Sequence, residues 1–249
     1  MRTKLRQLGV VLGCVLVAAA APCRAQQAPA AAPPDGWQFQ VTPYVWLVGI
    51  DGNIKIGRLG SGGGETSFSD VWSDLHFAWM GAFEARHGRW GALVDTFYAD
   101  LSIGTSDASV DIKDQFYTAL ASYRAYDGPV KVDVLLGPRY THVDADLTLT
   151  TGILAGRNAS TAIDWWDAIG GARVGWQSSS GWLVTGYGDL GGGGDDRFTW
   201  QVLAAGGYRF KKLTTLSFGY RYLSIDYDDG RIVYHITMAG PFVGVGFRF

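Results

Sequence analysis

Apolar and polar side chains alternate along most of this chain with a period of two, as they do in a strand with one apolar face. The segment 197–210 shows the pattern clearly. One face carries Phe198, Trp200, Val202, Ala204, Gly206, Tyr208 and Phe210, and the other carries Thr199, Gln201, Gly207 and Arg209. The same alternation recurs through the chain and predicts an all-β protein.

Ten such segments are separated by turn and loop residues. Strands are expected near 37–48, 76–86, 90–101, 115–126, 131–143, 166–177, 181–190, 197–210, 213–225 and 240–249. Their lengths are close to the roughly nine to eleven residues that a tilted strand needs to cross the hydrocarbon of a bilayer.

The connections between these strands alternate between short and long. Short ones are expected at 87–89, 127–130, 178–180 and 211–212, and longer ones at 49–75, 102–114, 144–165, 191–196 and 226–239. Short periplasmic turns and longer extracellular loops are typical of bacterial outer-membrane barrels. The sequence therefore predicts a transmembrane, antiparallel, up-and-down β-barrel of ten strands over 37–249.

Charged side chains keep mainly to one face of the expected strands. A lysine or arginine that faces lipid at mid-bilayer costs about 2–4 kcal/mol, and a slip of one residue would turn every arginine toward lipid. The phase of the charges thus favours a membrane barrel over a soluble sandwich. It is weaker in 90–101, 115–126 and 181–190, so eight or twelve strands remain alternatives.

The connection 49–75 is long enough to hold structure of its own. We expect a hairpin that pairs Asn53–Ile56 with Thr66–Ser69 around three glycines, followed by one or two helical turns over 69–75.

Tryptophans near strand ends are expected to form interfacial girdles. They are Trp37, Trp90, Trp165, Trp166 and Trp182.

The first 25 residues have the composition of a secretory signal. A basic start precedes the apolar stretch Leu8–Ala21, which is too short for a spanning helix. The small-x-small pattern Cys23–Ala25 predicts cleavage after Ala25. A lipoprotein box ending at Cys14 is disfavoured because little apolar core would precede it. Residues 26–36 are expected to form a flexible periplasmic leader.

Removal of this presequence changes what the mature chain can do. Both cysteines lie in the presequence, so no disulfide, metal–thiolate site or cysteine nucleophile is available afterwards. The presequence also holds four of the 21 basic and none of the 23 acidic residues, which leaves 17 basic residues and a net charge of −6. That acidic balance argues against nucleic acid as a partner.

The last ten residues, Gly240–Phe249, alternate between an apolar row and a row rich in glycine. The ending resembles the C-terminal sorting signal of bacterial outer-membrane barrels, with Phe249 last, Phe247 two places before it and Gly244 five places before it. The resemblance implies that Gly244, Phe247 and Phe249 form a barrel-assembly signal. It also implies the barrel-assembly machinery as a partner during biogenesis.

Further segments carry a wider resemblance. Thr42–Trp46, Phe68–Val71, Met80–Arg86 and Gly88–Gly91 are similar to an uncharacterised family of proteobacterial outer-membrane β-barrel proteins. The resemblance implies a single barrel in the outer membrane of a Gram-negative bacterium, in contact with lipid and lipopolysaccharide. That family brings no established activity, so no catalytic residue is carried over.

The candidate lumen-lining residues are charged residues on the expected inward face of the strands. They are Glu84, Arg86, Asp95, Arg124, Asp133, Arg139, Arg173, Arg209, Arg221 and Arg248. A cation-lined lumen would pass or bind small anionic solutes. In the alternative, the arginines pair with carboxylates and fill the lumen. Ten strands lie nearer to filled eight-stranded barrels than to open sixteen-stranded ones.

Aspartates crowd the expected loops, and two histidines lie among them. The groupings are His142 with Asp144 and Asp146, and His235 with Asp226, Asp228 and Asp229. Such groups could activate water if they met across the barrel mouth, and carboxylates could hold calcium or magnesium against lipopolysaccharide phosphates. No specific motif supports either chemistry. We therefore predict no catalytic, cofactor-binding or metal-ligating residue, and no cofactor.

Three functional hypotheses remain. The first is a non-enzymatic barrel, either structural or a narrow small-solute channel with an arginine-rich lumen. The second is a rim hydrolase of the omptin or lipase type that uses loop histidines and aspartates. The third is a surface adhesion or lipopolysaccharide-binding barrel that acts through loops 49–75 and 144–165.

Overall fold

The computed structural model describes residues 36–56, 61–66, 75–104, 108–149, 158–194, 196–210, 213–228, 230 and 232–249. It contains strands β1 (Trp37–Trp46), β2 (Gly49–Ile56), β3 (Ser61–Thr66), β4 (Leu75–His87), β5 (Trp90–Gly104), β6 (Ala108–Asp127), β7 (Val130–Leu149), β8 (Asn158–Gln177), β9 (Trp182–Gly192), β10 (Arg197–Phe210), β11 (Thr214–Asp228) and β12 (Ile232–Arg248). Within these ranges no helix has the length and apolar character needed to cross a bilayer. The predicted signal peptide 1–25, its cleavage after Ala25 and nearly all of the leader 26–36 lie outside the described residues.

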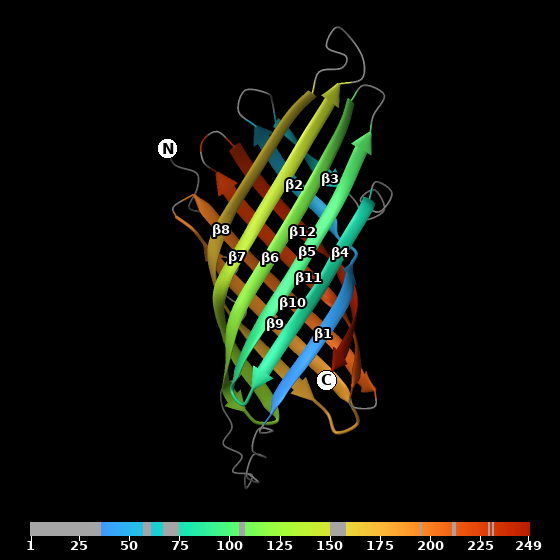
Figure 1. Ribbon diagram of the computed structural model, residues 1–249, viewed down its shortest axis with the longest axis vertical. Coiled ribbons are helices and arrows are strands. Elements are labelled where there is room, and N and C mark those ends of the chain that lie inside the picture. Colours follow the sequence, from blue (N-terminus) through green and yellow to red (C-terminus); the bar gives the residue numbers. More distant parts are fainter. Residues whose placement is uncertain are drawn as a thin grey trace. The chain divides into compact units, whose positions relative to one another are not determined.

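Ten of these strands close into an antiparallel barrel (Figure 1). They neighbour one another in the order β1, β4 and then β5 to β12, and β1 pairs with β12 to close the ring. In that closing pair, the N–H groups of Phe39 and Phe249 each donate to the carbonyl of the other residue at 3.0 Å. The predicted barrel of ten strands is confirmed, and the alternatives of eight and twelve strands are wrong.

The two ends of the barrel differ. Trp37 and Phe249 lie at the end that also carries the turns β4–β5, β6–β7, β8–β9 and β10–β11, which we call the turn rim. The opposite end is called the loop rim; it lies at the top of Figure 1.

The hairpin β2–β3 stands where the sequence predicts a hairpin, but its register differs. Asn53 pairs with Gly63 and Ile50 with Thr66, so the three glycines belong to β3 and not to the turn. β2 also continues the line of β1 along β12, with Gly49 opposite Ala239. The pairing with β12 joins residues far apart in sequence, so local turn residues alone could not predict it. The expected helical turns lie almost entirely in 67–74, outside the described residues.

The pairing of β1 with β4 is short. It ends where Pro43 lies opposite Gly81, and from there on the described part of β1 pairs with β12 while that of β4 pairs with β5. Proline has no N–H to donate to a ladder. Further along β1, the N–H of Trp46 donates to the thioether sulfur of Met80 at 3.2 Å. A side-chain contact thus joins the two strands where the backbone ladder has stopped.

The barrel is taller at the loop rim than the sequence suggests. Strands β6, β7 and β8 have 20 residues each, about twice the length needed to cross the hydrocarbon. The expectation of long loops at 102–114, 144–165 and 226–239 is therefore wrong, because most of these residues extend the strands.

The reason is visible on β7 beyond Tyr140. There the outward positions are polar, with His142, Asp144 and Asp146, while the inward position 143 is a buried valine. The alternation continues, but with polar side chains outside and apolar ones inside. This is the pattern of a sheet in water around an apolar interior. Because its outward residues are polar, their composition alone predicts a loop.

The outer surface of the barrel on the side of the turn rim carries an apolar belt. Leu136, Leu190 and Phe218 expose 69%, 60% and 58% of their surface. Exposed aromatic residues toward the ends of the belt include Trp37, Trp90, Tyr126, Trp176 and Trp182 on one side and Phe77, Trp79, Tyr117, Trp166 and Phe198 on the other. This surface suits lipid contact. Of the five tryptophans predicted to form girdles, Trp165 does not belong there, because its ring faces inward and only 4% of its surface is exposed.

Candidate functional site

Ionic and apolar layers alternate along the interior of the barrel. From the turn rim, the inward positions of β7 are Asp133, Leu135, Gly137, Arg139, Thr141 and Val143. Neighbouring β6 repeats the order with Arg124, Leu120, Thr118 and Phe116. Two charged layers are therefore separated by one apolar layer and capped by another toward the loop rim.

The first ionic layer lies nearer the turn rim and joins four strands. Arg173 of β8 donates to Glu84 of β4 at 2.7 and 2.8 Å and to Asp133 of β7 at 2.8 and 3.1 Å. Arg86 also donates to Glu84 at 3.2 Å and to Asp133 at 3.0 Å. Arg124 of β6 donates to Asp133 as well. Because β4 and β8 are not neighbours in the sheet, the contacts of Arg173 cross the lumen.

The second ionic layer centres on Arg139, of which only 1% is exposed. Its Nη2 donates to both carboxylate oxygens of Asp189 on β9, at 2.9 and 3.1 Å. It also donates to the hydroxyl of Thr118 at 3.1 Å and to that of Thr199 at 2.8 Å. Asp189 accepts a further bond from Gln201 at 2.6 Å. A buried arginine is tolerated when its donors are satisfied in this way.

Arg221 of β11 extends this layer across the barrel. It donates to Asp95 of β5 at 2.8 Å, to the hydroxyl of Tyr44 on β1 at 2.8 Å and to Gln201 at 2.9 and 3.1 Å. Its guanidinium lies 4.9 Å from the ring centroid of Trp46, in the geometry of a cation–π contact. Since Gln201 bonds both Asp189 and Arg221, one connected network reaches from β1 and β5 to β9.

Apolar side chains fill the interior between and above these networks. Leu120, Leu135 and Ile169 form the cluster between the two ionic layers. The larger cluster toward the loop rim contains Trp46, Val48, Phe97, Ala99, Leu101, Phe116, Val143, Trp165, Leu223, Ile225, Tyr234, Ile236 and Met238. Sequence reasoning missed these layers. The sequence feature that pointed to these layers is the weaker alternation in 90–101 and 115–126. In these segments apolar residues share the inward face with polar ones.

The structure places all ten candidate lumen residues on inward positions. Eight of them belong to the two ionic layers. Arg209 and Arg248 lie near the turn rim, where Arg248 donates to Gln40 at 3.3 Å. Sequence reasoning missed the neutral partners and Asp189, because pairing across the lumen depends on strand order.

The two histidine–aspartate groupings do not converge. His142 Nε2 lies 3.0 Å from Asp144 Oδ2 on the outward face of β7. His235 Nδ1 lies 2.7 Å from Asp226 Oδ1 on the outward faces of β12 and β11. These strands lie on different sides of the ring, and both pairs point away from the mouth. No group of three or more potential metal ligands occurs in the part of the chain that the structure describes.

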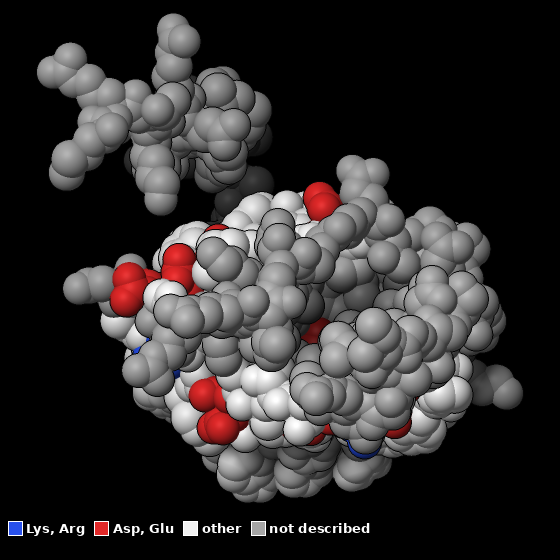
Figure 2. Space-filling model, turned by 90° about the horizontal axis from the view of Figure 1, so that it is seen from above, with Lys and Arg blue, Asp and Glu red and all other residues white. Residues whose placement is uncertain are grey.

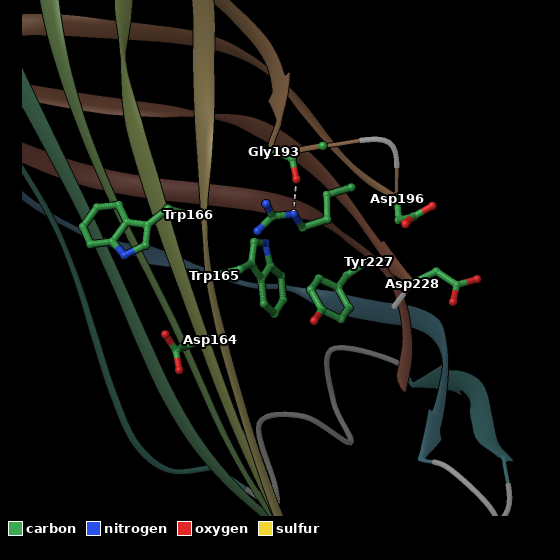
Figure 3. A pocket seen from close by; sticks show the side chains of 9 residues that line it. Asp164, Trp165, Trp166, Gly193, Asp196, Tyr227 and Asp228 are labelled. Carbon is green, nitrogen blue, oxygen red and sulfur yellow. Dashed lines mark hydrogen bonds between the residues drawn. The ribbon is translucent and has the colours of Figure 1, made fainter. Parts of the chain in front are cut away.

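A pocket opens at the loop rim, where the described surface shows acidic side chains at several places (Figure 2). Its volume is about 490 Å³. It lies among the ends of β8, β10 and β11 and the β9–β10 connection, and its lining residues are Asp164, Trp165, Trp166, Gly193, Gly194, Asp196, Arg197, Tyr227 and Asp228 (Figure 3). No sequence motif singled this pocket out.

Comparison with known proteins shows the fold. No protein-family model and no curated protein matches the chain by sequence. The chain is similar to the outer membrane protease OmpT from Escherichia coli, with a TM-score of 0.54 and 7% identity over 87% of this chain and 98% of that one. Ail, the attachment invasion locus protein of Yersinia pestis, gives a TM-score of 0.40 at 13% identity, covering 86% of this chain and 99% of its own. The chain is thus an outer-membrane-type β-barrel, and the narrower family resemblance stays a prediction.

Proposed function

We propose that this chain is a non-enzymatic outer-membrane barrel whose lumen is closed by its own side chains. The observation that carries the proposal is the buried network of Arg139 and Arg221, which connects strands on opposite sides of the ring. Apolar clusters lie on both sides of that network. In this proposal the turn rim faces the periplasm, the apolar belt contacts lipid, and the loop rim meets lipopolysaccharide.

The balance of charge in the lumen favours a structural barrel over an anion channel. In the first layer, Arg86, Arg124 and Arg173 face Glu84, Asp127 and Asp133. In the second, Arg139 faces Asp189 and Arg221 faces Asp95. A ring of arginines selects anions when its positive charge is available to the ion. Here carboxylates neutralise most of that charge; of the arginines predicted to line the lumen, Arg209 and Arg248 lie outside the two networks.

Planar-bilayer recording of the purified protein tests the proposal. We expect no stable conductance steps from the wild type or from Arg139→Ala, because the apolar clusters still close the lumen when one arginine is removed. Anion-selective steps that change in Arg209→Ala would overturn the closed barrel and favour the narrow channel.

Location and assembly belong to the same proposal. The protein should sediment with outer membranes and migrate differently on gels before and after heating, as a folded membrane barrel does. Recovery of the processed chain in a detergent-free soluble fraction would contradict it.

A rim hydrolase remains the second hypothesis, since the shared fold with OmpT leaves activity open. A panel of peptides and lipid esters tests it. Hydrolysis lost in His142→Ala or His235→Ala would replace the non-enzymatic proposal.

A further inference from the structure

The loop-rim pocket has an aromatic floor. The rings of Trp165 and Tyr227 lie with their centroids 4.7 Å apart and their planes inclined by 33°, and Figure 3 shows them side by side. The Trp165 ring also contacts that of Tyr234 at 5.8 Å. Trp165 exposes only 4% of its surface, so Tyr227 is the more exposed of the two rings. The packing holds the ring of Tyr227 rigid, and a ligand could cover its exposed part at little entropic cost.

The floor is electron-rich. The indole N–H of Trp165 donates to Asp167 Oδ2 at 2.9 Å, and Asp167 is 97% buried because only 3% of its surface is exposed. Its Oδ1 is also buried and has no hydrogen-bond partner among the described residues. A carboxylate that accepts from an indole pushes electron density into the ring. This strengthens the negative face that attracts cations.

The walls add negative charge. Asp164, Asp196 and Asp228 line the pocket and are exposed, and Arg197 is its one basic lining residue among those described. Figure 3 shows Asp196 and Asp228 on one side of the two rings and Asp164 on the other. Three carboxylates and one guanidinium leave a formal charge of −2 on the lining, in which Asp164 and Asp228 are at outward positions of β8 and β11. The buried Asp167 lies beneath this lining.

Arg197 lies against the β9–β10 connection. Its Nε donates to the carbonyl of Gly193, as the dashed line in Figure 3 marks. A Cβ at Gly193 would lie 2.6 Å from Nη2 of Arg197 and 2.7 Å from the carbonyl oxygen of Trp166. The glycine therefore allows the guanidinium to pack against the β9–β10 connection.

We propose that this pocket binds a small organic cation, namely a substituted or quaternary ammonium group. Aromatic faces beside carboxylates are the recurrent means by which proteins recognise such groups. The volume of about 490 Å³ lies within the range of small-molecule sites. A ligand of this kind reaches the pocket from outside, so the inference stands whether the lumen is closed or open.

Calorimetric titration with choline chloride tests the proposal on the purified full-length barrel. The detergent should be an uncharged polyoxyethylene ether, because a phosphocholine detergent would compete. We expect saturable binding that weakens several-fold as salt rises from about 0.05 to 0.5 M, since exposed charges are screened. The neutral isostere 3,3-dimethyl-1-butanol should bind at least about tenfold more weakly, because it lacks the charge that the rings attract.

Matched variants locate the site. The double change Asp196→Asn and Asp228→Asn should weaken choline binding about fivefold, as expected for two exposed charge contacts. The control changes Asp144→Asn and Asp146→Asn, which remove the same charge from β7 at the same rim, should leave the affinity unchanged. Arg197→Gln should tighten binding, because it removes the competing cation.

Several results would overturn the proposal. They are no saturable binding of choline, equal binding of the neutral isostere, and equal weakening in the pocket and control variants. Heat-shifted gel mobility shows that each variant is folded, so a loss of affinity in a folded pocket variant counts in favour of the site.

Discussion

The buried pair Arg139–Asp189 makes the sharpest prediction about stability. Their side chains are 1% and 0% exposed and are joined at 2.9 Å. Arg139→Met leaves the Asp189 carboxylate in the interior without its counter-charge, and the usual cost of breaking such a pair is about 3–5 kcal/mol. In this variant the side-chain amide of Gln201, 2.6 Å from Asp189 in the wild type, still donates to the carboxylate. We therefore expect the free energy of unfolding to fall by about 3 kcal/mol, near the lower end of that range.

A double-mutant cycle separates the charge effect from simple loss of packing. Asp189→Asn should cost a similar amount, since it leaves the guanidinium of Arg139 buried and uncompensated. The double variant should cost less than either single change, because no charge remains and the amide oxygen still accepts from Gln201. Lys131→Met serves as the control. Lys131 is 54% exposed and lies 3.6 Å from Asp127, so its removal should cost less than about 1 kcal/mol.

Urea unfolding from lipid vesicles, followed by tryptophan fluorescence, measures these free energies. The reasoning would be refuted if Arg139→Met cost no more than Lys131→Met. It would also fail if the cost of the double variant equalled the sum of the single costs, since the two charges would then not be coupled.

Three further outcomes follow from the fold. Leu136→Arg should reduce the free energy of folding into vesicles by about 2–4 kcal/mol, because that side chain is 69% exposed on the apolar belt; no change would argue against lipid contact there. Gly137→Ala should lower the urea midpoint, since its Cβ would lie 2.0 Å from the carbonyl oxygen of Ala119 and overpacking typically costs about 1–3 kcal/mol. Gly186→Ala is the control: open space surrounds its Cβ, so the urea midpoint should not change. Phe249→Ala should reduce the folded fraction recovered in outer membranes, and undiminished assembly would remove the predicted role of the terminal residue.

The ten barrel strands could be predicted from the alternation of apolar and polar residues along the chain. Near the apolar belt one face of each strand meets lipid, so exposed apolar residues such as Leu136 alternate with inward residues such as Arg139. That alternation was enough to locate all ten wall strands. It failed beyond the belt, where water covers the outside and the polarity of the two faces is reversed. There His142 and Asp144 resemble loop residues although they belong to β7.

The candidate sites were less accessible from sequence. The inward position of Arg221 followed from alternation, but its partner Asp95 is on a strand 126 residues away in sequence. The loop-rim pocket likewise combines Trp165 and Tyr227 with a connection between other strands. No spacing in the chain signals such a meeting, because it depends on how the ring closes.

The sequence by itself determined where the ten barrel strands run through the apolar belt, which face of each strand meets lipid there, and which rim carries the short turns. These properties depend on residues near one another in the chain and on the different costs of placing apolar and charged groups in lipid or water. Only the tertiary structure decided that carboxylates neutralise most of the inward arginines, that apolar clusters separate the charged layers, and that two rings and three aspartates share one pocket. Those outcomes depend on contacts across a closed cylinder, where strands far apart in sequence become neighbours.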